Sequence, residues 1–239
     1  MKVKRDQRRW WIPAGLLAGS VLLAGCNHGS DSTPATMKRM FKVEVTNLTA
    51  NQPLSPIAAV LHRSGYHAWQ EGNAATVGLE RLAESGDGAD LLSEAQSDSA
   101  FLSKEAGSGV IPPGQSGSIQ MEAAASDPRL SLVTMLVNTN DAFAGLDAVD
   151  LSSLAPGEQL TVSAIAHDAG TEPNSETAAT VPGPAGGGEG FNADRSGDVD
   201  FIAVHRGVVT RDDGLANSAL DQSHRFDNPV ARVVITRLQ

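Results

Sequence analysis

The chain has 239 residues, a formal net charge of −10 at pH 7 and an aromatic content of only 4%. A strongly acidic chain is poorly suited to binding nucleic acid, and anionic lipid surfaces would repel it. Cys26 is the single cysteine, which excludes an internal disulfide, so the fold must rely on a core of Val, Leu, Ile and Ala.

The first 25 residues have the features of a bacterial lipoprotein signal peptide. Five basic residues within the first nine precede an apolar stretch, Trp10 to Leu23, that is too short to span a bilayer. Leu23-Ala24-Gly25-Cys26 then has the form of a lipobox. We therefore predict a signal peptide over residues 1–25, lipid attachment at Cys26 and a polar tether over residues 26–40. An ordinary signal peptide with a chance cysteine is the alternative.

Acyl chains on Cys26 would provide the connection to the membrane, because the acidic chain offers no basic patch for this purpose. Asn27 follows the cysteine, and in bacteria with two membranes this resembles the sorting signal of an outer-membrane lipoprotein. We therefore expect a lipid-anchored protein of the cell envelope, at the outer membrane. The sequence does not indicate which face of that membrane the domain occupies.

Short apolar or alternating segments, separated by Gly, Pro, Ser and Asp, predict an all-β fold. The expected strands cover residues 41–47, 55–63, 118–123, 130–137, 142–149, 159–166, 199–205 and 230–238. Seven or eight such strands are typical of an antiparallel β-sandwich. Two short helices, expected at residues 74–85 and 90–97, are inserted between strands and should cap one end of the β domain.

Three acidic residues lie just beyond two of these strands. Asp141 comes after the strand expected at 130–137. Asp168 comes after the strand expected at 159–166, and Glu172 lies four residues further on. If the two strands flank a return strand in a meander, they run in the same direction and the carboxylates converge. Converging carboxylates repel one another unless a cation lies among them, and oxygen ligands on loops suit calcium. Solvated loop acids are the alternative interpretation.

Several motifs occur in a fixed order along the chain. They are Ser55-Pro56-Ile57, Trp69-Gln70-Glu71-Gly72, Leu82-Ala83-Glu84-Ser85-Gly86-Asp87, Asn138-Thr139-Asn140-Asp141-Ala142-Phe143-Ala144-Gly145, Asp168-Ala169-Gly170-Thr171-Glu172 and Asn228-Pro229-Val230. Together they resemble the spondin N-terminal domain family, seen in F-spondin and mindin, over residues 41–239.

The resemblance implies a C2-like antiparallel β-sandwich with a calcium ion in the loops at one end. The family's ligands correspond to Asp141, Asp168 and Glu172, and Glu172 stands where the family has Asp. Ala142 stands where the family has Trp, so a packing or partner-contact residue of the animal relatives is absent at this position, and the resemblance leaves open whether their recognition surface is retained. At family level, the resemblance implies adhesion or extracellular recognition, with a surface protein or a glycan as partner.

Two other functions remain open at this point. A metal-dependent hydrolase would use His ligands and an open coordination position, and His167, His205 and His224 lie in the domain. However, the chain contains neither His-Glu-x-x-His nor Gly-x-Ser-x-Gly. An envelope assembly or chaperone lipoprotein would bind extended segments at a sheet edge. We favour a non-catalytic, calcium-binding module for adhesion or for extracellular or periplasmic recognition.

Overall fold

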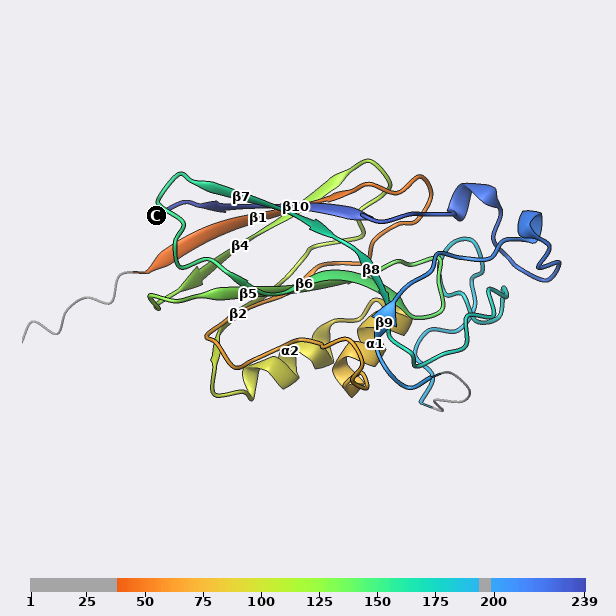
Figure 1. Ribbon diagram of the computed structural model, residues 1–239, viewed down its shortest axis with the longest axis horizontal. Coiled ribbons are helices and arrows are strands. Elements are labelled where there is room, and N and C mark those ends of the chain that lie inside the picture. Colours follow the sequence, from red (N-terminus) through yellow and green to blue (C-terminus); the bar gives the residue numbers. More distant parts are fainter. Residues whose placement is uncertain (1–37, 194–198) are drawn as a thin grey trace, which may run out of the picture. The chain divides into compact units, whose positions relative to one another are not determined.

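The computed structural model describes residues 38–193 and 199–239, in which two antiparallel sheets pack face to face (Figure 1). The predicted signal peptide, Cys26 and most of the predicted tether lie outside the described residues. Neither helix in the described part of the chain is long and apolar enough to cross a lipid bilayer.

One sheet has four strands and the other has six. The four-stranded sheet has the order β4-β1-β10-β7, with β1 at Arg39–Asn47, β4 at Ser116–Ala123, β7 at Gln159–Ala164 and β10 at Ala231–Arg237. The six-stranded sheet has the order β3-β2-β5-β6-β8-β9, with β2 at Ala58–His62, β3 at Phe101–Ala106, β5 at Arg129–Met135, β6 at Ala142–Asp150, β8 at Ala166–Asp168 and β9 at Ala203–Val204. The fold is thus an all-β sandwich, as predicted.

Alternation along the strands explains the main core. In β1, Phe41, Val43 and Val45 are fully buried, whereas the residues between them are half-buried. Val43 pairs with Ile235 on β10 and with Ile119 on β4, so the apolar side chains of three strands share the face toward the other sheet. Removing this apolar surface from water is the main force that holds the two sheets together.

The helices α1 (Val77–Ser85) and α2 (Ala89–Gln96) lie in a different place from the one predicted. Instead of capping an end of the sandwich, they cover the outer face of the six-stranded sheet (Figure 1). The reason is that this face of the sheet is also apolar. Its buried members Val60, Val133 and Phe143 pack in one cluster with the helix residues Leu79 and Leu82.

The strand predicted at 159–166 is divided between the two sheets. Its first part, β7, pairs with β10, and its last part continues into β8, which pairs with β6. The meander expected of β5, β6 and the following strand is therefore completed by β8. Strand β3 was not predicted, and β9 covers only the end of the strand expected at 199–205. Two 3₁₀ turns, Arg211–Asp213 and Gln222–His224, complete the described elements.

Candidate functional site

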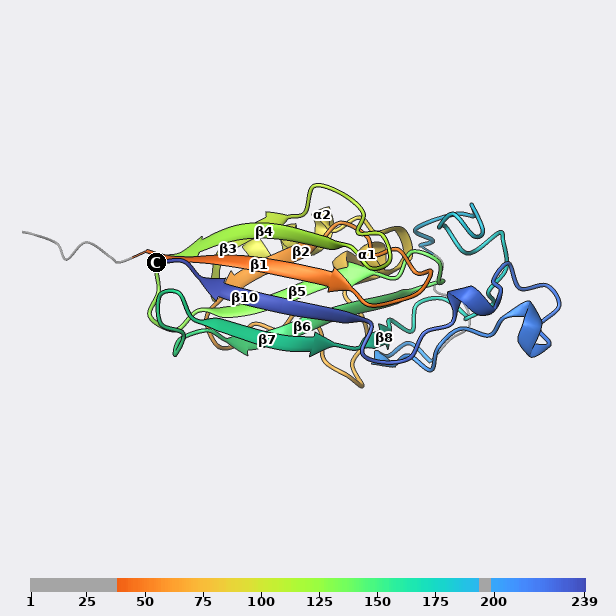
Figure 2. The same cartoon turned by 90° about the horizontal axis from the view of Figure 1, so that it is seen from above.

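The candidate site lies where β6 begins and β8 ends. Ala142, the first residue of β6, pairs with Asp168, the last residue of β8. The backbone N–H of Ala169 donates to the carbonyl oxygen of Asp141 at 3.2 Å. The long segments 169–193 and 205–230 gather at this end of the sandwich, away from the C terminus (Figures 1 and 2). The topology thus brings Asp141 and Asp168 together, as the meander predicted.

Asp141 is fully buried, and its two carboxylate oxygens have different environments. Oδ2 accepts hydrogen bonds from the backbone N–H of Thr171 at 2.8 Å, from its hydroxyl at 3.3 Å and from the N–H of Glu172 at 3.1 Å. Oδ1 is buried and has no hydrogen-bond partner among the described residues. Burial, and secondly the Asp168 carboxylate, raise the pKa of Asp141 well above its usual range.

Asp168 holds the loop that follows β8. Its Oδ1 accepts from the N–H of Gly170 at 2.9 Å, and its Oδ2 accepts from the side-chain amide of Asn174 at 2.6 Å. Gly170 has φ +71°, and a Cβ there would collide with the backbone of Phe201. A glycine is therefore required at the turn that returns the chain toward Asp141.

Glu172 is buried, but its carboxylate faces other acids. Its Oε2 accepts from the side-chain amide of Asn140 at 3.4 Å. Burial, followed by the charges of Glu84, Glu189 and Glu80, raises the pKa of Glu172 to about 7. The first and last of these glutamates lie on α1. Glu172 thus lies in the field of acids on the helix, whereas Asp141 lies in the field of Asp168.

Two further titratable residues lie in the field of Asp168: Glu176, which the sequence did not single out, and His205, which it offered only to the alternative hydrolase. Glu176 is 1% exposed; its Oε1 accepts from the N–H of Val209 at 3.2 Å, and its Oε2 is buried without a partner among the described residues. Burial, and further the Asp168 charge, raise the pKa of Glu176 to about 7. His205 accepts from the N–H of Gly207 at Nδ1, and burial lowers its pKa although Asp168 opposes this shift. Glu176 lies in an irregular loop, so no periodicity in the sequence marks it as buried.

The arrangement of these acids can be compared with what a calcium ion requires of its ligands. The buried, unpartnered Oδ1 of Asp141 beside a second carboxylate is what a cation would satisfy. Within residues 38–193 and 199–239, however, no group of three or more Asp, Glu, His or Cys side chains is arranged to hold a metal ion. Asp141 therefore offers one unsatisfied oxygen beside Asp168, but the predicted trio with Glu172 is not arranged as a metal site in the described residues.

Two of the three histidines considered for a hydrolase, His167 and His224, are engaged in local contacts. His167 is buried, stacks on Phe143 with ring centroids 5.2 Å apart, and places Nε2 3.1 Å from Oε1 of Glu71. His224 is a buried residue of the turn that contains it, with Nδ1 3.0 Å from Oδ1 of Asp221. These contacts are typical of structural histidines, whose ring nitrogens orient loops.

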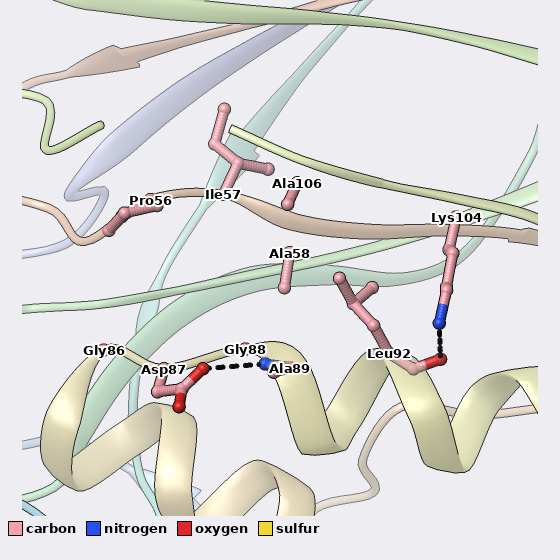
Figure 3. A pocket seen from close by; sticks show the side chains of 10 residues that line it. All are labelled: Pro56, Ile57, Ala58, Gly86, Asp87, Gly88, Ala89, Leu92, Lys104 and Ala106. Atoms are coloured by element: carbon pink, nitrogen blue, oxygen red, sulfur yellow. Dashed lines mark hydrogen bonds between the residues drawn. The ribbon is translucent and has the colours of Figure 1, made fainter. Parts of the chain in front are cut away.

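Two hollows of the domain lie elsewhere. One, of about 410 Å³, lies between β2, β3 and the turn that joins the two helices (Figure 3). At its border, Lys104 donates to the carbonyl oxygen of Leu92 at 3.4 Å. Another, of about 490 Å³, is lined by Tyr66, Trp69 and residues at the start of α1. The site acids line neither of them, so neither hollow belongs to the candidate site.

The chain matches a known protein family. The model of the family described as Spondin_N matches residues 40–182, which include both sheet-end acids and the first part of the segment after β8. The matched region covers more than half of the chain. A search of curated proteins returned no match.

Proposed function

Because this chain belongs to the spondin N-terminal domain family, we propose that it is a recognition or adhesion module of the cell envelope whose loop end is organised by calcium. The observation that carries the proposal is the buried Oδ1 of Asp141, which has no partner in the described chain and lies in the field of Asp168. Family membership and the all-β fold support a non-catalytic module.

Calcium would change the electrostatic balance of the loop end. Two carboxylates near each other in a buried site are costly because like charges repel and water is largely excluded. A divalent cation removes this cost and stabilises the folded chain by an amount that grows with its free concentration. Since Asp141 and Asp168 precede or end strands and also hold the loop after β8, the ion would fix that loop to the rigid sheets.

A rigid loop end would serve as the recognition surface. The segments 169–193 and 205–230 extend from this end, and the loops at one end of a sandwich are where binding residues commonly lie. We propose that this surface binds a surface protein or a glycan. Lipid on Cys26 would hold the domain at the membrane through the predicted tether, and Asn27 after the cysteine favours the outer membrane.

The two alternative functions receive less support. A hydrolase would need ligands with an open coordination position, and His167 and His224 are engaged in local contacts. Strand capture would need an accessible sheet edge. The edge strand β3 exposes Lys104 and Glu105, and charged side chains on an edge oppose pairing with another strand.

The direct test is thermal unfolding of the full chain in detergent, with millimolar calcium or with chelator. We expect calcium to raise the midpoint of the wild-type protein, and Asp168→Asn to lose most of this increase. Asp127→Asn, which also removes one negative charge but at an exposed turn position, is the matched control and should respond as the wild type does. An unchanged wild-type midpoint in millimolar calcium would overturn the proposed function.

A further inference from the structure

The hollow of about 490 Å³ beside the start of α1 has a lining that the proposed function does not use. Its residues come from the segment 65–76, from the first turn of α1, and from Asp98 and Ile202. The lining combines the aromatic rings of Tyr66 and Trp69 with several polar side chains, and none of the lining residues that the structure describes is a lysine or an arginine. A hollow of this size with a few converging polar groups is typical of a site for a small ligand.

The two aromatic rings of the hollow differ in how firmly they are held. Trp69 is 7% exposed and packs edge-on against Phe143, with ring centroids 5.3 Å apart. Gly145 on β6 leaves space for this ring, since a Cβ there would lie 2.7 Å from it. Tyr66 is only half-buried, and its ring meets that of His62 edge to face, with centroids 4.9 Å apart. The hollow therefore has one ring fixed in the core and one that a ligand can reach.

The loop that carries these rings is attached to the rest of the domain on both sides. Asp147 on β6 accepts a hydrogen bond from the N–H of Ala68 at 2.8 Å. Further along the loop, the N–H of Gly72 donates to the carbonyl oxygen of Ile202, and the N–H of Ile202 donates to the carbonyl oxygen of Asn73, both at 2.8 Å. A loop that is already ordered loses little conformational entropy when a ligand binds, so the hollow is preorganised.

Three exposed polar side chains at the hollow keep hydrogen-bonding capacity for a ligand. Asn73 donates to Oε1 of Gln70 at 3.0 Å, which is the only side-chain hydrogen bond of either amide within the described residues. Oδ1 of Asp98 accepts from the N–H of Ala100 at 2.7 Å, and Oδ2 has no partner in the described chain. Donors and acceptors thus lie beside aromatic rings. A sugar matches this combination, because its hydroxyls both donate and accept and its C–H face is apolar.

The charge around the hollow disfavours an anionic ligand. Glu94 accepts from the hydroxyl of Thr76 and from the N–H of Gly78, each at 2.7 Å, so a carboxylate already occupies the N-terminus of α1. Burial, followed by nearby carboxylates, raises the pKa of Tyr66 above its usual range, so its hydroxyl stays protonated. A cation is attracted to the same carboxylates, but an ammonium group accepts no hydrogen bond and would leave the donors of Tyr66 and Gln70 unused.

We propose that this hollow binds a neutral saccharide, whose C–H face packs on Tyr66 and whose hydroxyls form hydrogen bonds with Gln70, Asn73 and Asp98. The inference goes beyond the proposed function, because it adds a glycan-binding site outside the loop end and requires no calcium. The Trp69 side chain forms the fixed wall of the site, so binding of a saccharide changes the surroundings of its indole ring.

The experiment is titration of the full chain in chelator, in a detergent without a sugar head group. The neutral probes are maltotriose, cellotriose and chitotriose, with trigalacturonate as the anionic comparison and choline as the cationic one. Trp10→Phe with Trp11→Phe leaves Trp69 as the only tryptophan, so tryptophan fluorescence then reports on the hollow. We expect a saturable change in Trp69 emission with at least one neutral probe, and none with trigalacturonate or choline.

Variants of the lining locate the binding site. Tyr66→Ala should weaken binding of the neutral probe by about tenfold or more, because exposed aromatic anchors carry much of the affinity of a site. Asn73→Ala, at an exposed position, should weaken it by about threefold or more and keeps the test valid if Tyr66→Ala does not fold. Phe201→Ala is the matched control, since Phe201 is 40% exposed and adjacent to Ile202 but does not line the hollow. Its affinity should stay at the wild-type value.

Several outcomes would overturn the inference. They are the lack of a saturable response to every neutral probe at millimolar concentration, an affinity that Asn73→Ala and a folded Tyr66→Ala both leave unchanged, and a preference for trigalacturonate or choline. Saccharide binding that requires calcium would also overturn it, while it would support recognition at the loop end. A chain that binds the saccharide in chelator but is not stabilised by calcium would keep this inference and refute the proposed function.

Discussion

Two buried polar networks lie next to each other at the loop end of the sandwich, and they differ in how well their atoms are satisfied. The first consists of the side-chain amides of Asn47, Gln52 and Asn138. The second consists of Asp141, Asp168, Glu176 and His205. The two networks are neighbours in the chain, because Asn138 is only three residues before Asp141.

Every side-chain nitrogen and oxygen of the first network has at least one hydrogen-bond partner. Asn47 donates to the carbonyl oxygens of Gln52 and Ile111 at 2.8 and 3.0 Å, and accepts from Thr49. Gln52 donates to the carbonyl oxygen of Asn138 and accepts from its N–H. Neutral amides offer both donors and acceptors, so backbone groups are enough to satisfy them.

The acids of the second network have no such solution. Asp141 and Glu176 each retain one buried oxygen without a partner in the described chain, and none of Asp141, Asp168 and Glu176 forms an ion pair with a described Lys or Arg. A carboxylate only accepts hydrogen bonds, so it needs donors or a cation. The comparison therefore separates a network whose side-chain atoms are satisfied by the chain from one that keeps two buried oxygens without a partner in the described residues.

Breaking the satisfied network should have the largest effect. Asn47→Ala leaves the N–H of Thr49 without its partner. The carbonyl oxygens of Gln52 and Ile111 each lose one hydrogen bond but keep another, from the Thr49 hydroxyl and from the N–H of Leu54. We expect a loss of about 2–3 kcal/mol in the free energy of unfolding, because a buried group left unsatisfied costs about 1–3 kcal/mol and each further lost hydrogen bond costs less. The midpoint should fall by about 4–12 °C. Equal losses in calcium and in chelator would confirm a purely structural role, whereas a loss confined to chelator would contradict it.

The sequence predicts the strands and the first two acids well, because both depend on local patterns. The alternation of apolar and polar residues in 41–47 predicts β1. The positions of Asp141 and Asp168 after apolar runs predict that the two residues lie at the same end of the sheet. Strand β3 was missed because only its first two residues are apolar and it pairs only with β2 at a sheet edge. The placement of the helices depends on which sheet face is apolar, which the sequence does not reveal.

The environments of Glu172 and Glu176 could not be predicted from the sequence, for a related reason. Both residues lie in a loop with no periodicity, and their burial comes from segments far along the chain. Val209 and Ala219, more than 30 residues away, contact Glu176 through backbone groups that any amino acid would offer. Spacing shows how many acids follow β8, but only tertiary contacts show which of them faces Asp168.

The next largest effect should come from pH, through the buried acids at the loop end of the sandwich, which include Glu172 beside the second network. Burial raises the pKa of Asp141, Glu172 and Glu176 above the values of the unfolded chain, so the folded state holds their protons more tightly. Stability is then greatest when the protons are bound, and it falls as pH rises through the folded pKa values near 7. Each group should contribute about 0.4 kcal/mol between pH 7 and pH 8, because a group with a pKa near 7 is already half deprotonated at pH 7.

The measurement is the thermal midpoint in chelator, which we expect to be higher at pH 7 than at pH 8. Below about pH 6.5 the thermal midpoint no longer reports on the acids alone. Burial lowers the pKa of His62, His167 and His205, so their protonation favours the unfolded chain. Calcium competes with the protons, so its stabilising effect should be larger at pH 8. A chelated protein whose midpoint rises between pH 7 and pH 8 would contradict this interpretation of the acids.

The smallest effect, and the one of opposite sign to Asn47→Ala, should come from Asp141→Asn. The amide oxygen can keep the hydrogen bonds from Thr171 and Glu172, while the new NH₂ group replaces the unpartnered oxygen and carries no charge. We expect the variant to be more stable than the wild type by about 1 kcal/mol at pH 8 in chelator, because repulsion with Asp168 is removed. It should also show a shallower dependence on pH and no response to calcium. Loss of stability in chelator would mean that the Asp141 carboxylate is already satisfied without a cation, and the difference between the two networks would then disappear.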